Sequence, residues 1–141
     1  MDVRAFRPGD TDAVVALWER CGLTRPWNDP RRDIERKLNE QPELFLVGTV
    51  QGEPIASAMA GFDGHRGWLY YLAVHPNHRG AGHARALVEE IERTLTMRGV
   101  PKLNLQVRDD NLHALAFWKA MGYTREHNVS LGRRLIPDGP S

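Results

Sequence analysis

The residues with the clearest chemical potential are the small ones between Arg79 and Ala84, which precede a helical pattern. Small residues leave the first backbone N–H groups of a helix uncovered, and these groups have no partner within the helix. With the positive end of the helix dipole they form an anion site, and glycine lets a phosphate approach the backbone. Taken alone, the turn fits either this anion site or a tight connection that binds nothing.

Two well-known phosphate motifs are excluded by spacing. No Gly-Lys-Ser/Thr follows the turn, so it is not a nucleotide-triphosphate loop, and Arg85 stands where the dinucleotide fingerprint needs a third glycine. Arg79 would lie beside a bound phosphate or cap the loop as a solvated arginine. We favour the phosphate, because anion and helix dipole coincide at this turn.

A strand and a helix are expected to position the turn. The apolar, aromatic-rich run Trp68–Val74 predicts a buried strand, which Pro76 ends because proline donates no backbone hydrogen bond. After the turn, apolar residues recur at the spacing of one helix face, and they predict a helix that runs to Arg98. These apolar positions are Ala84, Leu87, Val88, Ile91 and Leu95.

Two motifs in this order resemble the GNAT superfamily of acyl-CoA-dependent N-acetyltransferases. Val74–Pro76 followed by Arg79–Ala84 is similar to the family's pyrophosphate motif, Arg/Gln-x-x-Gly-x-Gly/Ala after Val-x-Pro. Asn111–Tyr123 is similar to a second feature, an Asn that opens a helix ending in an aromatic residue before Gly-aromatic. The resemblance covers nearly the whole chain, and Arg25–Pro30 and Asp63–Gly67 resemble the small bacterial branch called YpeA-like.

The resemblance implies acetyl-CoA as cosubstrate and direct attack by an amine in a ternary complex. The pantetheine arm would lie where the strand 68–74 and a strand beginning at Lys102 diverge, since α/β sheets bind ligands at such ends. An oxyanion would be bound by a backbone N–H near Leu72–Val74. The residues expected to contact acetyl-CoA are Leu72, Ala73, Val74, Arg79, Gly80, Ala81, Gly82, His83, Ala84, Asn111 and Trp118.

The acid and base usual in the family are missing here. Many members carry a tyrosine at the position of Trp118, whose indole does not titrate, and a glutamate on the central strand, where 68–75 has no carboxylate. A thiol with a pKa of about 8.5 leaves without an acid, whereas a lysine-like amine with a pKa of about 10.4 must lose a proton. Tyr70 and Tyr71 are the catalytic candidates, because they alternate faces and one is expected to point into the cleft.

Two loops are expected to contact the acceptor, which is an amine of a small molecule or a protein. The candidate residues are Arg25, Trp27, Asn28, Asp63 and His65. Trp27 either forms a substrate wall or fixes its loop to the core. Asp63, His65 and His75 are further candidates for a base, although each histidine is more simply a turn or surface residue. Asn111 either binds the carrier or only caps its helix.

Composition limits the class of protein. The length of 141 residues suits one domain, expected over 1–136, with a loose tail at 137–141. Hydrophobic content of 41% and charged content of 26% are typical of a folded rather than a disordered chain. A net charge of +1 gives no reason to expect nucleic-acid or membrane partners, and no apolar run approaches the roughly 20 residues of a membrane span.

The remaining composition features concern location, metals and assembly. The N-terminus has no signal-peptide core, so a cytoplasmic location is expected by default. The single Cys21 excludes an internal disulfide, and His75, His78 and His83 lack paired ligand spacing, so no metal is expected. The resemblance also makes a homodimer possible.

The whole pattern predicts an α/β (α+β), GNAT-like fold with a mostly antiparallel sheet of six to seven strands and about four helices. Strands 4 and 5 are expected to be parallel, because a strand–helix–strand unit of this length is usually a parallel crossover. The resemblance implies that the two strands splay. Strands are predicted at 3–7, 44–50, 54–62, 68–74 and 102–107, with a final hairpin over 123–126 and 129–135. An acyl-CoA-binding module with weak or no catalysis is the alternative to an N-acetyltransferase.

Overall fold

Five strands form one mixed sheet in the order β1-β2-β3-β4-β5 in the computed structural model, which describes residues 1–139. The strands are β1 (Asp2–Ala5), β2 (Phe45–Val50), β3 (Glu53–Phe62), β4 (Gly67–Val74) and β5 (Leu103–Leu105). The helices are α1 (Thr11–Arg20), α2 (Pro30–Leu38), α3 (His83–Met97) and α4 (Leu112–Ala120). Short 3-10 turns lie at Pro8–Asp10, Pro42–Leu44 and Pro76–His78. Residues 140 and 141 of the expected tail lie outside the described residues.

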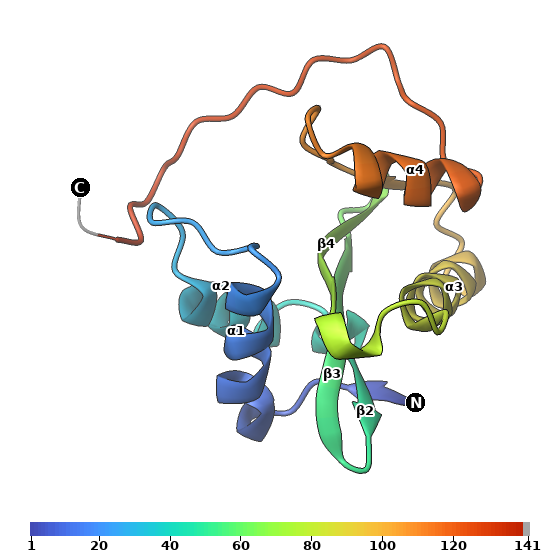
Figure 1. Ribbon diagram of the computed structural model, residues 1–141. Helices are drawn as coiled ribbons and strands as arrows, with labels where there is room; N and C mark the ends of the chain where they lie inside the picture. The colour runs from blue at the N-terminus through green and yellow to red at the C-terminus, as the bar shows by residue number, and fades with distance from the viewer. Residues whose placement is uncertain (140–141) are drawn as a thin grey trace.

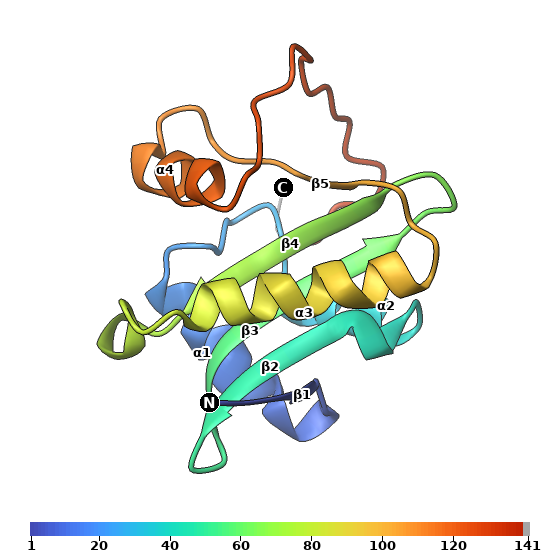
Figure 2. The same ribbon diagram turned by 90° about the vertical axis from the view of Figure 1, so that its right-hand side faces the viewer.

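The helices cover the two faces of the sheet. Figure 1 shows α1 and α2 on one face and α3 on the other, and Figure 2 shows α3 lying across the strands. Each face has its own apolar core, because alternate residues of a strand point to opposite sides. Leu87, Val88 and Ile91 of α3 are fully buried in one core, and Val14 and Trp18 of α1 are fully buried in the other.

The expected antiparallel strands and the expected parallel pair are both present. β2, β3 and β4 pair antiparallel in sequence order, and β4 pairs parallel with β5 after the α3 crossover. The predicted helix start at Asn111 is confirmed, because its side chain accepts from the N–H of Ala114 at 3.1 Å. Asp29 begins α2 in the same way and accepts from the N–H of Arg31 at 2.9 Å. Both side chains therefore satisfy N–H groups that have no partner within the helix.

A bulge interrupts β4 in its second half. The register passes from Tyr70 opposite Met59 to Ala73 opposite Ser57, so that two residues of β4 face one residue of β3. Tyr71 has a φ of +52°, which is uncommon for a residue other than glycine. Such local strain persists only where surrounding contacts fix it, so the bulge marks a segment that the fold holds in one place.

The prediction of six to seven strands is wrong, because the structure has five. The expected final hairpin at 123–126 and 129–135 does not form within the described residues; instead the C-terminal segment (124–139) runs irregularly from α4 across to α2 (Figure 1). Its apolar residues Val129 and Leu131 are 85% and 92% exposed. Their alternation had suggested a strand, but no core covers them, and burial is what stabilises such a pattern.

Candidate functional site

The glycine turn before α3 is open and its N–H groups are free. Gly80 and Gly82 have φ values of +83° and +80°, and a Cβ at either position would meet nothing within 4 Å. No side chain caps α3, and among residues 1–139 no protein acceptor bonds the backbone N–H groups of residues 80–85. A helix N-terminus with uncovered N–H donors favours a negatively charged ligand. Because no side chain of the described residues covers the turn, a diphosphate can approach its backbone.

Arg79 ties this turn to the end of β4. Its Nε donates to the carbonyl of Val74 at 3.2 Å, and Nη2 lies 3.7 Å from Sγ of Cys21. The Cys21 thiol also donates to the Val74 carbonyl, at 3.4 Å. The guanidinium thus stands beside the turn as a fixed cation, which fits both sequence interpretations of Arg79: it anchors a loop and it adds positive charge there.

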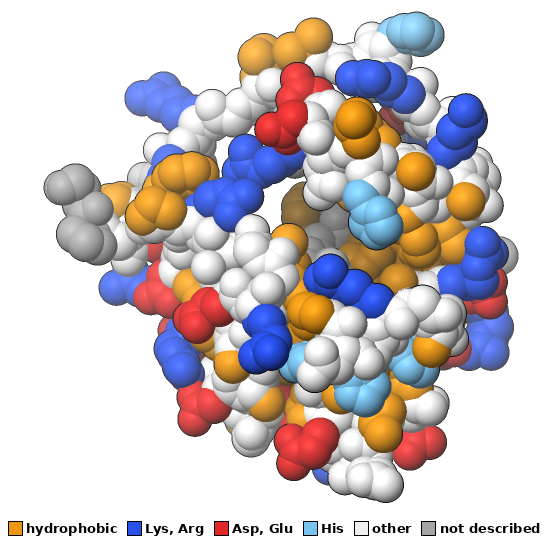
Figure 3. Space-filling model, in the orientation of Figure 1, with side chains coloured by type: hydrophobic (Ala, Val, Ile, Leu, Met, Phe, Trp, Pro, Cys, Tyr) orange, Lys and Arg blue, Asp and Glu red, His pale blue; other side chains and the backbone are white. Residues whose placement is uncertain are grey.

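β4 and β5 separate after three pairs. Gly67, Trp68 and Leu69 face Leu103, Asn104 and Leu105, and no β5 residue pairs with β4 beyond that point in the described chain. Leu72, Ala73 and Val74 therefore lie in the splayed part of β4, as expected for residues beside a bound acyl carrier. The space-filling view shows a hollow in this region, below α4 (Figure 3).

The two candidate tyrosines lie in different surroundings. Tyr70 is 50% exposed, and burial of its other half and then the nearby Asp63 raise the pKa of its phenol. Tyr71 stacks on Trp18 with ring centroids 3.8 Å apart and an interplanar angle of 9°. Burial, and then the hydrogen bond to Asp33, raise the pKa of Tyr71 well above its usual value. Both phenols therefore stay protonated at neutral pH.

Tyr71, Asn28 and Asp33 form a hydrogen-bonded cluster between the bulge of β4 and α2. The Tyr71 hydroxyl donates to Oδ2 of Asp33 at 2.7 Å, and Nδ2 of Asn28 donates to the same carboxylate at 2.5 Å and to Tyr71 Oη at 2.8 Å. Arg134 of the C-terminal segment donates to Oδ1 of Asn28 at 2.6 Å. Three segments that are distant in sequence, around residues 28–33, 71 and 134, thus meet at one point beside the splayed strand.

Sequence reasoning identified Asn28 and Tyr71 but missed Asp33. The available signal was its position on α2, directly before Ile34, which is one of the two apolar residues that face α2 to the core. A carboxylate at the edge of an apolar stripe lies where the helix meets the sheet. Composition alone gave no reason to connect it to a tyrosine 38 residues later.

The structure does not bring the other expected acceptor residues to the splay. Oδ1 of Asp63 accepts from the N–H groups of His65 and Arg66 at 2.8 and 2.7 Å, in the turn before β4. From Gly67 at that end to Leu72 the strand rises about 16 Å. Arg25 donates to carbonyls of its own loop, those of Gly22 and Thr24, both at 2.8 Å.

Trp27 and the two helix-4 residues also have defined places. Trp27 is 56% exposed and lines a shallow cavity of about 580 Å³ with Arg36 and residues 132–136 of the C-terminal segment. Asn111 caps α4, which is the second of the two roles that the sequence left open for it. Trp118 is only 8% exposed and packs edge-on against Phe117 and Tyr123, so its ring belongs to the core.

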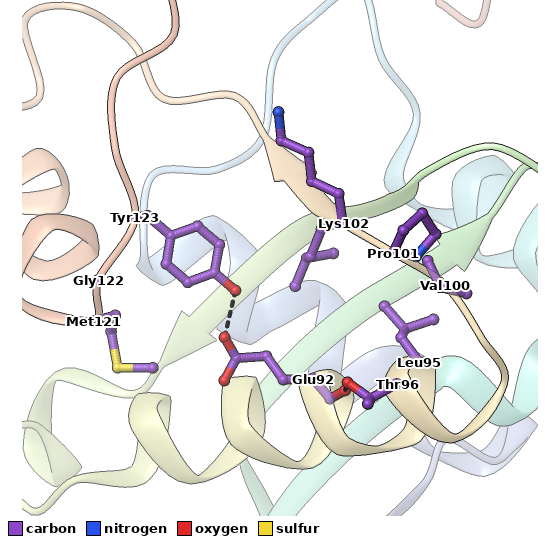
Figure 4. A pocket seen from close by; sticks show the side chains of 10 residues that line it. Glu92, Leu95, Thr96, Val100, Pro101, Lys102, Met121, Gly122 and Tyr123 are labelled. Atoms are coloured by element: carbon purple, nitrogen blue, oxygen red, sulfur yellow. Dashed lines mark hydrogen bonds between the residues drawn. The ribbon is translucent and has the colours of Figure 1, made fainter.

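A second cavity lies away from the glycine turn. It measures about 440 Å³ and is formed by the C-terminal half of α3, the start of β5 and the end of α4 (Figure 4). The Tyr123 hydroxyl donates to Oε2 of Glu92 at 2.7 Å across it, and burial followed by Glu92 raises the pKa of Tyr123. Its lining includes Leu103, where β4 and β5 are still paired, and none of the residues of the splayed part of β4.

The histidines near the turn are turn residues in the structure. Nδ1 of His75 accepts from the N–H of Asn77 at 3.1 Å, and burial followed by nearby Arg20 lowers the pKa of His75. Among residues 1–139, no three His, Cys, Asp or Glu side chains come together in a way that could hold a metal ion. Within the same residues, no helix combines the length and apolar character needed to cross a bilayer.

Comparison with known proteins agrees with this geometry. A model of the acetyltransferase (GNAT) family matches residues 11–123. An acetyltransferase of Pectobacterium atrosepticum is 52% identical over 138 residues, which cover 98% of each chain. Ard1 of Thermoplasma volcanium is 25% identical with a TM-score of 0.76, covering 87% of this chain and 82% of its own.

A second similar structure was solved with a ligand. Naa20 of Chaetomium thermophilum, in complex with a bisubstrate analogue, is 27% identical with a TM-score of 0.70, covering 88% of this chain and 71% of its own. The family model spans most of the chain, and the Pectobacterium relative matches it almost end to end. The chain therefore belongs to the GNAT family of acetyltransferases and is an acyltransferase.

Proposed function

We propose that the protein transfers an acetyl group from acetyl-CoA to a primary amine of a small molecule or protein, by direct attack in a ternary complex. The observation that carries this proposal is the free row of N–H groups at residues 80–85 beside a strand pair that separates after Leu69. The first feature suits the diphosphate of CoA, and the second leaves backbone free to pair with the pantetheine arm.

The proposed reaction forms one bond and breaks another. The amine nitrogen attacks the thioester carbon, the C–N bond forms, and the C–S bond breaks with release of the thiolate, which then takes up a proton. A backbone N–H of the bulged segment near Leu72–Val74 would stabilise the oxyanion, because the bulge frees backbone groups that a regular ladder would use. The bisubstrate analogue bound to the Chaetomium relative supports simultaneous binding of both substrates.

Tyr70 and Tyr71 suit proton donation better than proton abstraction. Burial raises the pKa of both phenols, so neither is a base at neutral pH. A protonated phenol near the sulfur can donate to the leaving thiolate, although a thiol with a reference pKa of about 8.5 does not require it. We propose Tyr70 as a hydrogen-bond donor on this ground, and Tyr71, whose hydroxyl already donates to Asp33, as part of the acceptor side.

The proposal is tested by measuring thiol release from acetyl-CoA across a panel of primary amines, together with a thermal shift on addition of CoA. We expect CoA to raise the melting temperature and at least one amine to be acetylated. The alternative, a binding module without catalysis, is favoured by the core position of Trp118 and the absence of a carboxylate on β4. It predicts the thermal shift without turnover on any amine.

A further inference from the structure

We propose that Asp33, held by Asn28 and Tyr71, binds the acceptor as an ammonium ion and selects for positively charged amines. The inference rests on the proposed acetyl transfer and assigns the acceptor side of the same site. It is carried by a partly exposed carboxylate that hydrogen-bonds to the residue at the bulge of β4. A cation bound there would lie beside the splayed strand, where its nitrogen must meet the thioester.

Asp33 retains the capacity to accept a further hydrogen bond. An ionised carboxylate offers about four acceptor positions. Three are used: Oδ2 accepts from Asn28 and Tyr71, and Oδ1 accepts from Arg36 at 3.1 Å. The side chain is 20% exposed, and Oδ1 has one acceptor position without a hydrogen-bond partner among the described residues. An ammonium group has three donors and no acceptor, and it suits that position.

Arg36, the cation next to Asp33, is bound more tightly by another carboxylate. It donates to the two oxygens of Asp138 at 2.5 and 3.2 Å, in a two-pronged arrangement, and Arg134 lies 3.6 Å from the same group. The Asp138 side chain is fully buried. Asp33 therefore shares the charge of Arg36 with Asp138, so this one guanidinium does not fully neutralise Asp33, which can attract a second cation.

The other acidic and basic candidates lie elsewhere. β4 itself carries no carboxylate, and Asp63 accepts hydrogen bonds within the turn before Gly67, from which the strand rises about 16 Å to Leu72. His75 is at the glycine-turn end of β4 among Arg20 and Arg79, which repel a cation. Among the described residues whose hydrogen bonds reach the β4 bulge, Asp33 is thus the anion that can receive an ammonium group.

The step is balanced without any further reactant. The bound ammonium releases one proton to water, and its lone pair attacks the thioester carbon. As the C–S bond breaks, the second proton passes from nitrogen to the thiolate, which gives the amide and free CoA thiol. Asp33 binds and orients the cation, and Tyr71 and Asn28 are positioning residues that fix the carboxylate.

The test compares a charged acceptor with an uncharged one in wild type and in Asp33→Asn. The charged acceptor is the best aliphatic amine of the panel, and the uncharged one is an aromatic amine that is neutral at pH 7. We expect Asp33→Asn to lower the ratio of the two kcat/KM values ten- to a hundredfold, the range for a hydrogen bond to a charged group. A merely structural role would lower both values together and leave the ratio unchanged.

Two further variants keep the test sharp. Glu35→Gln removes the same charge from an exposed position of α2, and we expect its ratio to equal that of wild type. Asp33→Glu restores the carboxylate and should recover part of the preference. Calorimetry with CoA should give the wild-type Kd for all three variants, because the glycine turn is unchanged.

The possible failures are distinguishable. A wild-type ratio in Asp33→Asn would overturn the assignment of Asp33 while leaving the acetyltransferase proposal in place. Absence of turnover by wild type on every amine would overturn the acetyltransferase proposal. In that case the inference would fail as well, unless calorimetry on the CoA complex showed the panel amines binding to wild type and not to Asp33→Asn.

Discussion

At the scale of single residues, the proposed CoA site depends most on Gly82. Its φ of +80° and the empty space above its Cα let an anion reach the N–H groups of α3. We expect Gly82→Glu to abolish CoA binding, because a carboxylate would fill the mouth of the turn and repel a diphosphate. The measurement is the Kd for CoA by calorimetry, and unchanged affinity would contradict the account.

The control for this change is Gly99→Glu at the other end of α3. Gly99 has a φ of +78° and equally open surroundings, so the same side chain meets the same backbone strain there. Left-handed backbone costs a non-glycine residue about 1–2 kcal/mol, and both variants should lose stability of that order. Only Gly82→Glu should also lose CoA.

At the scale of elements, the bulge of β4 is held by a buried serine. Ser57 is fully buried; its hydroxyl accepts from the Trp18 indole at 2.8 Å and donates to the Tyr71 carbonyl at 3.1 Å. We expect Ser57→Ala to lower the free energy of unfolding by about 1–3 kcal/mol, because it leaves buried polar groups unpaired. Urea denaturation measures the effect, which should be smaller in a Trp18→Phe background. Additive losses would show that the three groups do not act together.

Elements that begin or end at a helix cap or a turn glycine were predictable from sequence. Asp29-Pro30 and Asn111 begin helices because their side chains satisfy N–H groups a few residues away, and Gly52 serves the β2–β3 turn with a φ of +80°. The last predicted hairpin failed because a strand needs a partner and a covered face, which no local pattern supplies. The turn before α3 is likewise determined by local residues, whereas the position of Asp33 depends on long-range packing.

At the scale of the whole molecule, Asp138 fastens the C-terminal segment to α2. Hydrogen bonds from Arg36, and then from the N–H of Asp29, hold the pKa of Asp138 at about 2. A carboxyl whose pKa falls on folding stabilises the folded form above its unfolded pKa of about 3.9, and this contribution is lost as the pH falls toward 2. We expect Asp138→Asn to be less stable than wild type at pH 6, with the difference vanishing near pH 2.

Denaturation of both proteins across this pH range measures the effect. Trypsin provides a second measurement, because Arg125, Arg133 and Arg134 lie in the C-terminal segment. Asp138→Asn should be cut there faster than wild type at pH 7. Equal cleavage rates, together with a stability difference that does not depend on pH, would show that the ion pair does not hold the segment.

Whether a feature could be predicted depends on how far apart in sequence its contacting residues lie. The glycine turn, its strand and its helix lie within 31 consecutive residues, 68–98, so their spacing and the resemblance of their motif indicated an anion site. Asp33 and Tyr71 meet across 38 residues, and Arg36 and Asp138 across 102, so only the folded chain brings them together. The acceptor side of the site is built from contacts of this second kind, which explains why Asp33 was not expected. Asn28 was expected only because its loop, Arg25–Pro30, resembles a segment of the family.

The most direct test of the central claim is a titration of ¹⁵N-labelled protein with CoA, followed by backbone amide shifts. We predict that the largest and saturable changes occur at Gly80, Gly82, His83 and Ala84, with smaller ones at Leu72 and Val74. Inorganic pyrophosphate should shift the turn amides alone. CoA-induced changes that leave the amides of residues 80–84 unmoved would contradict the account.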